Sequence, residues 1–150
     1  MYGFDGGKKV KGRKRHILVD SQGWLLKVLV SEANMPERLG AIAALIELPE
    51  EDLRELELIW VDQGYGGDNF ARVVGQVCGA RVEVIRKKEK DFEILPRRWV
   101  VERTFGWFNH YRRLSKDYEK LPEVSEALIY SVMCRLMLSR LTSATLTSSL

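Results

Sequence analysis

Cysteine and histidine are scarce in this chain, which has two of each in 150 residues. Cys78 and Cys134 form no Cys-x-x-Cys motif, and no histidine pair lies near either of them. This spacing argues against a thiolate-held metal site. A disulfide between the two stays open. Both cysteines occur in apolar helical contexts where a free buried thiol is common, which suits a reducing cytosol.

Long hydrophobic runs are also missing. The most apolar segment, residues 127–134, is bounded by Glu126 and Arg135, and a membrane-spanning helix needs about 20 apolar residues. The first seven residues are rich in glycine and have no apolar run of the kind found in a secretion signal. We therefore expect a cytoplasmic protein.

Charge is abundant but unevenly distributed. Hydrophobic residues make up 45% and charged residues 30% of the chain, which fits one globular domain with its own core. The net charge of +3 is modest. However, the basic residues gather in four clusters, at 8–16, 86–90, 97–98 and 112–113. Four such clusters in a short chain favour a nucleic-acid partner over a merely solvated surface.

The order of predicted elements is that of an α/β domain covering residues 1–141. A hairpin over residues 16–30, with its turn at 20–23, comes first. The elements expected after it are a helix at 37–48, a strand at 56–61, a helix at 69–78, a strand at 81–86 and helices at 96–114 and 123–141. The Ser/Thr-rich residues 142–150 are expected to be a disordered tail.

The helix predicted at 96–114 carries a single acid on a basic stripe. Its apolar positions share one broad face, whereas Glu102 shares the opposite face with Arg98, Asn109 and Arg113. Taken alone, this pattern favours a solvated salt bridge between Arg98 and Glu102, worth a few tenths of a kcal/mol. The alternative is a carboxylate directed at a metal ion and a phosphate.

A second carboxylate, Asp62, follows the predicted buried strand at 56–61 and precedes a glycine-rich turn. Functional groups of open α/β sheets emerge at such strand ends, although an aspartate there can also simply cap its own turn. Asp62 and Glu102 would be two acids on separate elements, surrounded by arginine and lysine. Two-metal phosphoryl chemistry uses acidic oxygens to hold Mg²⁺ ions about 3.5–4 Å apart.

Three motifs resemble the DDE transposases of the insertion sequence 4 and insertion sequence 5 superfamily. Gly-Gly-Lys-Lys-Val-Lys-Gly-Arg-Lys-Arg-His-Ile-Leu-Val-Asp, at residues 6–20, is similar to their basic hairpin. Leu-Ile-Trp-Val-Asp-Gln-Gly-Tyr, at 58–65, is similar to the strand with their second catalytic Asp. Leu-Pro-Arg-Arg-Trp-Val-Val-Glu-Arg-Thr-Phe-Gly-Trp, at 95–107, followed by Arg-Arg-Leu-Ser-Lys-Asp-Tyr-Glu at 112–119, is similar to the helix with their catalytic Glu.

The resemblance covers roughly residues 3–141 and implies an RNase H-like mixed sheet flanked by helices. By the same resemblance, Asp62 and Glu102 are catalytic residues that bind Mg²⁺, or Mn²⁺ in its place. The implied activity is cleavage of transposon-end DNA and strand transfer into target DNA, at the bacterial nucleoid. The implied phosphate contacts are Lys8, Lys9, Lys11, Arg13, Lys14, Arg15, Arg98 and Arg113.

The sequence departs from this family at two places. Leu95 and Asn109 stand where the insertion sequence 4 branch has Tyr and Lys around the Glu, so a lysine-like DNA contact is not expected at Asn109. The first catalytic Asp of the family lies on a strand before the basic hairpin, and neither Asp5 nor Asp20 matches it. We therefore expect the C-terminal portion of a longer transposase, without the first strand of the fold.

Loss of that strand would expose ladder groups on its two neighbours, so we expect a marginal or aggregation-prone product. One alternative function is a non-catalytic DNA-binding remnant that interferes with a full-length transposase or joins its oligomer; a homo-oligomer is the other partner expected. An RNA-binding module is a third reading, and it has no supporting aromatic-rich motif.

Overall fold

The structure, a computed structural model, describes residues 2–7, 9–85 and 96–147, without the side chains of 96–98 and 144–147. The strands are β1 (Gly3–Asp5), β2 (Val10–Val19), β3 (Leu25–Glu32), β4 (Leu58–Val61) and β5 (Arg81–Val84). The α-helices are α1 (Glu37–Ile46), α2 (Glu50–Arg54), α3 (Asp68–Cys78), α4 (Pro96–Asn109) and α5 (Pro122–Thr147). Two short 3-10 helices are η1 (Gln63–Tyr65) and η2 (Arg112–Leu114).

The predicted hairpin forms an antiparallel sheet in the order β1-β2-β3. Its turn is fixed by Asp20, whose Oδ1 accepts hydrogen bonds from the backbone N–H groups of Gln22 and Trp24, each at 2.8 Å. Gly23 in this turn has a φ of 89°, a conformation that favours glycine. β2 starts at Val10, six residues before the predicted strand, because β1 and the end of β3 supply its partners.

The predicted strand–helix–strand unit is confirmed as a second, parallel sheet. β4 pairs with β5 in parallel, from Leu58 with Arg81 to Val61 with Val84, and α3 connects them. Gly79 ends α3 in the left-handed conformation, with a φ of 73°. Within the described residues this two-stranded sheet has no ladder to the β1-β2-β3 sheet.

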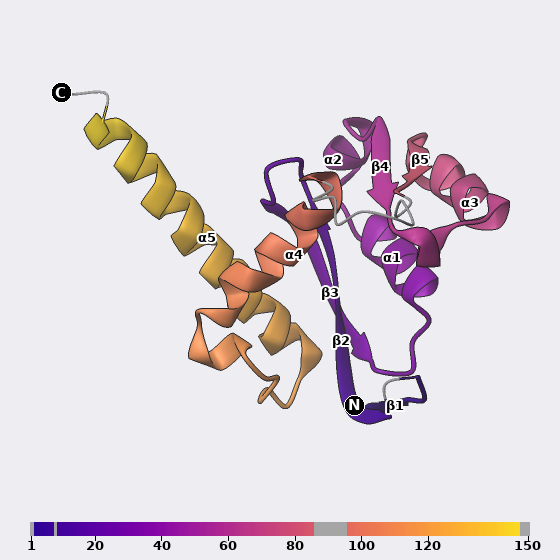
Figure 1. Cartoon of the computed structure of the whole chain (residues 1–150), viewed down its shortest axis with the longest axis horizontal. Helices are drawn as coiled ribbons and strands as arrows, with labels where there is room; N and C mark the ends of the chain where they lie inside the picture. The colour runs from indigo at the N-terminus through magenta and orange to yellow at the C-terminus, as the bar shows by residue number, and fades with distance from the viewer. Residues whose placement is uncertain (1, 8, 86–95, 148–150) are drawn as a thin grey trace, which may run out of the picture.

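Two clusters of buried side chains make up the core, and Figure 1 shows α1 on one side of the β2–β3 hairpin and α4 and α5 on the other. The first joins β3 to α4, η2 and α5 and contains Val28, Val30, Phe108, Leu114, Ile129 and Met133. The second joins α1, β4 and α3 and contains Leu45, Leu48, Ile59, Phe70, Val74 and Ala80. α1 contacts both β2 and α3, and thus connects the two parts. The predicted mixed α/β fold with flanking helices is confirmed at this level.

The helix ends differ from the sequence-based expectation. α4 ends at Asn109, where tighter bonds from the N–H groups of His110 and Tyr111 to Trp107 and Phe108 begin a turn into η2. α5 continues to Thr147 instead of ending at 141, and the Thr142 hydroxyl donates back to the Leu138 carbonyl. No helix in the described ranges is long and apolar enough to cross a membrane.

The edges of the two sheets differ in what hydrogen-bonds to them. On the outer edge of β3, the N–H of Val28 donates to the Tyr130 hydroxyl at 3.2 Å, and that of Val30 donates to Glu126 Oε1 at 2.7 Å. α5 therefore covers that edge. Among the described residues, β1 reaches only the first residues of β2, so the rest of β2 has strand pairing on the β3 side alone. Within the same ranges β4 pairs only with β5.

Candidate nucleic-acid and metal site

Asp62 lies directly after β4, at the carboxyl end of the strand, as the sequence predicts. Its Oδ1 accepts a hydrogen bond from the N–H of Gly64 at 2.9 Å and caps η1. The side chain is exposed. The turn-capping role weighed for this residue is therefore present, and it uses one of the two carboxylate oxygens.

Glu37 joins Asp62 at this turn, although the sequence pattern gave it no site role. A Cβ built on Gly64 would lie 3.1 Å from Asp62 Oδ1 and 3.9 Å from Glu37 Oε2. Arg38 Nε donates to the Gly64 carbonyl at 2.9 Å and fastens the start of α1 to η1. Burial, with the charges of Glu37 and Asp62 adding to it, raises the pKa of Tyr65 to about 12.

Glu102 lies on the exposed side of α4. The helix is held from its other side by Phe108, which is buried, and by Thr104, whose hydroxyl donates to the Gly23 carbonyl at 2.8 Å. The predicted apolar face is thus present at these positions, whereas Val101 is 37% exposed. Because the Arg98 side chain lies outside the described residues, the predicted Arg98–Glu102 pair stays a prediction.

The fold brings the elements of the two acids into contact, because α4 packs against β4 as well as β2. In the described part of the chain, however, no three His, Cys, Asp or Glu side chains converge closely enough to hold a metal ion. Carboxylate oxygens are the ligands that Mg²⁺ prefers, so Asp62 and Glu102 are chemically suited to it. The metal site itself stays a prediction.

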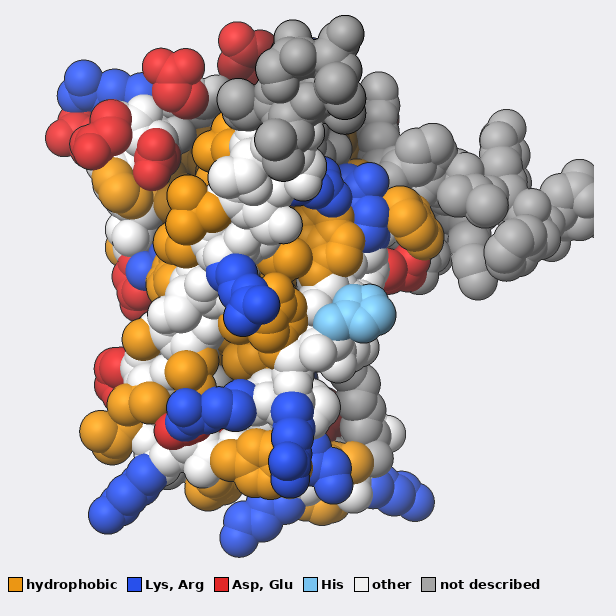
Figure 2. Space-filling view, turned by 90° about the vertical axis from the view of Figure 1, so that its left-hand side faces the viewer, with side chains coloured by type: hydrophobic (Ala, Val, Ile, Leu, Met, Phe, Trp, Pro, Cys, Tyr) orange, Lys and Arg blue, Asp and Glu red, His pale blue; other side chains and the backbone are white. Residues whose placement is uncertain are grey.

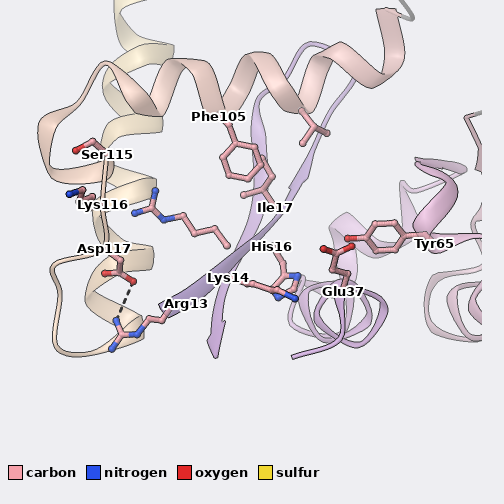
Figure 3. Close-up of a pocket in the computed structure, with 12 residues that line it drawn as sticks. Arg13, Lys14, His16, Ile17, Glu37, Tyr65, Phe105, Ser115, Lys116 and Asp117 are labelled. Carbon is pink, nitrogen blue, oxygen red and sulfur yellow. Dashed lines mark hydrogen bonds and ion pairs between the residues drawn. The ribbon is translucent and has the colours of Figure 1, made fainter. Parts of the chain in front are cut away.

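A cavity of about 500 Å³ is lined by β2 together with residues of α1, η1, α4 and the connection after η2. Figure 3 shows Glu37 and Tyr65 together on one side, Ile17 and Phe105 near α4, and Ser115, Lys116 and Asp117 on the side of the connection between η2 and α5. The lining therefore combines apolar, cationic and acidic groups. Its α4 residues, Val101 and Phe105, are near neighbours of Glu102 along that helix.

Three of the predicted DNA-contact cations are engaged within the protein. The Arg13 side chain is 1% exposed and donates to Asp117 and to the carbonyls of Glu119 and Lys120. The Lys14 ammonium lies 3.4 Å from an Asp5 oxygen. Arg15 donates to the Leu114 carbonyl at 2.7 Å, and burial lowers its pKa. In this arrangement these side chains stabilise the fold.

Other cations remain on the surface. Lys9 and Lys11 are exposed, and Arg113 is 70% exposed although it pairs with Glu119 at 2.7 Å. The sequence-based set omitted three exposed cations that lie near Arg113 in the chain, namely Arg112, Lys116 and Lys120. Figure 2 shows lysine and arginine side chains concentrated in the lower half of its face, the level of β1 and the η2–α5 connection in Figure 1. Lys8 lies outside the described residues, as does the side chain of Arg98.

The chain is similar to a known protein family and to a known protein. The family described as "Transposase DDE domain" matches residues 59–139, more than half of the chain, and this range includes Asp62 and Glu102. A protein of Burkholderia cepacia, named as a transposase for insertion sequence element IS402, is 27% identical over 129 residues. The match covers 82% of this chain and 61% of that protein, so the chain spans about three fifths of the length of this relative. No solved structure matches.

Proposed function

Because this chain belongs to the DDE transposase family, we propose that it forms part of a catalytic domain for DNA transposition. In this proposal Asp62 and Glu102 are two of the acids that bind divalent metal. The observation that carries it is the placement of both acids: Asp62 directly follows β4, and Glu102 lies on the helix that packs against β4. The family match, over residues 59–139, includes both positions.

In this proposal the α/β fold is RNase H-like, and one further strand lies between β2 and β4. Two strand edges support this placement. Among the described residues, the part of β2 that follows its pairing with β1 has one edge without strand pairing, and so has β4. A strand from a segment outside these 150 residues, or from another chain, would complete a single sheet and contribute the third acid. Without it, we expect a marginal or aggregation-prone protein. A sharp cooperative melt from a monomer would count against this part.

Bound Mg²⁺, or Mn²⁺, would stabilise the attacking and leaving oxygens during DNA cleavage and strand transfer. Asp62 and Glu102 would supply hard oxygen ligands. The capping bond from the Gly64 N–H to Asp62 Oδ1 fixes the orientation of that carboxylate, and buried Thr104 fixes the turn of α4 beside Glu102. Preorganised ligands of this kind reduce the reorganisation needed when the metal binds.

The DNA backbone would be held by the exposed cations, which release counterions when they neutralise phosphates. Lys9, Lys11 and Arg113 from the sequence-based set, with Arg112, Lys116 and Lys120, form this candidate surface. Arg13, Lys14 and Arg15 would hold this surface in place through their contacts within the protein. The partners in this proposal are transposon-end and target DNA, with a second copy or a full-length transposase, in the bacterial cytoplasm at the nucleoid.

The test uses a longer transposase that contains this chain and compares Asp62→Asn, Glu102→Gln and the control Asp68→Asn. Asp68 is an exposed acid in the first turn of α3. We expect Mg²⁺-dependent cleavage of insertion-sequence ends to be lost in the first two variants and retained in the control, with DNA binding unchanged in all three. Cleavage that survives either Asp62→Asn or Glu102→Gln would rule out the assignment. The 150-residue chain alone should show little or no strand transfer.

The exposed cations favour a second candidate, a non-catalytic DNA-binding remnant, because phosphate binding by Lys9, Lys11 and Arg113 needs neither acid. Such a protein would interfere with a full-length transposase or join its oligomer. Its DNA affinity would not respond to Mg²⁺ or to the Asp62→Asn and Glu102→Gln substitutions. The catalytic proposal requires Mg²⁺ to change how the longer protein acts on DNA, so the two candidates are separable by the same set of variants.

A further inference from the structure

The exposed face of α5 carries a heptad pattern of uncharged residues. Steps of three and four alternate along it, as in the a and d positions of a coiled coil. The residues at these positions are Val124, Ala127, Ser131, Cys134, Leu138 and Leu141, and all six are exposed. We call this set the α5 seam. At 1.5 Å per residue, it runs for about 25 Å along the helix.

The opposite face of α5 is already packed against the core. Ser125, Ile129 and Met133 are buried there at a spacing of four residues. Figure 1 shows α5 along the outer edge of the fold, on the far side from α1 and α3. A helix that is apolar on both faces is normally covered on both. The α5 seam therefore has the composition of an interface, although it faces solvent in the single chain.

The polar group in the middle of the α5 seam does not oppose burial. The Ser131 hydroxyl donates to the Ala127 carbonyl at 2.8 Å, so its hydrogen is already bonded within the helix. Ala127, Ser131 and Cys134 are also small, which allows a second helix to approach closely at this point. The largest exposed areas lie toward the end of the seam, at Leu138 with 62% and Leu141 with 65%.

We propose that the α5 seam binds the same seam of a second copy of this chain. The two helices would lie antiparallel around a two-fold axis that passes between residues 132 and 133. Such an axis presents one surface patch to itself, as in most homodimers. The inference extends the proposed function, in which a second copy is a partner, but its evidence does not depend on Asp62 or Glu102.

The sizes of the side chains fit the antiparallel orientation. It forms three kinds of layer, which are Val124 against the partner's Leu141, Ala127 against the partner's Leu138, and Ser131 against the partner's Cys134. In the first two layers a smaller residue meets a leucine, so the volume is similar along the pair. A parallel pair would instead set Leu138 against leucine and Ala127 against alanine, which crowds one end and leaves a gap at the other.

The charges of α5 favour the same orientation. Its acids, Glu123 and Glu126, lie near its start, whereas its cations, Arg135 and Arg140, lie in its second half. Antiparallel helices bring the acidic end of one beside the basic end of the other, and their dipoles also oppose each other favourably. Because the α5 seam itself carries no charge, it suits a copy of this apolar surface better than it suits DNA.

The first test measures the mass of the 150-residue chain by sedimentation equilibrium, which should show a dimer at micromolar concentration. Leu138→Glu should raise the dissociation constant of the dimer about 100-fold or more, because each dimer would bury two unpaired carboxylates. Leu39→Glu is the matched control, since Leu39 in α1 is 57% exposed but lies outside the α5 seam. It should leave the dissociation constant unchanged. Circular dichroism checks that both variants keep the wild-type helix content.

The second test measures the orientation of the two helices by cysteine cross-linking. Val124→Cys and Leu141→Cys are made in separate chains that also carry Cys78→Ser and Cys134→Ser, and a short bis-maleimide is added. The antiparallel pair should cross-link in a mixture of the two variants. Each variant alone should cross-link little, because equivalent positions at the ends of the seam would lie about 25 Å apart.

A wild-type chain that is a monomer overturns the proposal, as does an assembly of any size that Leu138→Glu leaves unchanged. Cross-linking of either cysteine variant alone would contradict the antiparallel orientation. A monomer whose Cys134 is protected from alkylation only within a longer transposase would assign the α5 seam to another segment of that protein, against a second copy. None of these outcomes tests Asp62 or Glu102, so the proposed catalytic function would stand or fall separately.

Discussion

The guanidinium of Arg13 on β2 lies 3.3 Å from the carboxylate of Asp117, although 104 residues separate the two in sequence. Figure 3 shows this pair crossing from the strand to the connection that precedes α5. The same guanidinium also donates to the carbonyls of Glu119 and Lys120. A residue expected at the DNA surface is thus a tie between the hairpin and the segment after α4.

Arg13→Ala should therefore lower the free energy of unfolding by about 3 kcal/mol, because it leaves a nearly buried carboxylate and two carbonyls without their donor. Arg113→Ala is the matched control, since Arg113 forms an ion pair in the same connection but is 70% exposed. Its loss should cost less than about 1 kcal/mol. Urea denaturation of the two variants measures both, and equal costs would contradict the structural role of Arg13.

Two helical glycines should respond oppositely to alanine. A Cβ on Gly40 in α1 would lie 2.2–2.4 Å from three atoms of the His16 ring, whereas a Cβ on Gly75 in α3 would meet nothing within 4 Å. Gly40→Ala should destabilise the fold by about 1–3 kcal/mol through overpacking. Gly75→Ala should stabilise it by about 0.5–1 kcal/mol through helix propensity. Thermal melts of both variants measure these changes. A Gly40→Ala variant as stable as the wild-type chain would mean that β2 and α1 can move apart without loss of stability.

His16 should make stability depend on pH. Its Nε2 lies 2.9 Å from the Ser31 hydroxyl in a buried position, and burial, with the charge of Lys14 adding to it, lowers its pKa while Glu37 opposes the shift. The unfolded chain then takes up a proton on this residue at a higher pH than the folded chain. The free energy of unfolding should fall as the pH drops below about 6.5, the ordinary histidine pKa, and reach a plateau below the lowered folded value.

His16→Gln should remove that part of the pH dependence, as measured by urea denaturation at a series of pH values between 5 and 7. His110 is the other histidine of the chain, and it is exposed after the end of α4. His110→Gln should leave the slope in place. If the two variants behave alike, the buried His16–Ser31 contact does not control the titration.

Asp62 should contribute to stability separately from any role in metal binding. Asp62→Ala removes the oxygen that accepts the Gly64 N–H and should cost about 1 kcal/mol, as for other lost caps. Asp62→Asn keeps an acceptor at that position and should melt within a few degrees of the wild-type chain. An Asn variant as unstable as the Ala variant would show that the carboxylate charge, and not the cap, holds the turn.

Local patterns were enough to predict most elements. The turn at 20–23, the β4–α3–β5 unit and the apolar face of α4 each depend on residues close together in sequence. The same is true of Asp62, whose strand end and glycine turn are adjacent. The ends of helices were harder to predict: the 3-10 turn after α4 depends on packing around buried Leu114, which belongs to the core formed with β3 and α5.

Long-range partners could not be predicted, and they change the candidate site most. The sequence marks residues 8–16 as basic, but only the packing shows that Arg13 and Arg15 donate to residues after α4 while Lys9 and Lys11 remain exposed. Glu37 beside Asp62 was likewise invisible in sequence, because α1 and η1 meet only in three dimensions.

The sequence by itself determined the family, the order of the elements and the two acids of the candidate site, because these depend on residue type and local spacing. The tertiary structure decided which cations face solvent and which carboxylate joins Asp62. These are questions of burial and of partners distant in sequence, such as Arg13 with Asp117 or Arg140 with Trp24. A charged or aromatic side chain serves the fold or a ligand according to what surrounds it, and only the packed chain fixes those surroundings.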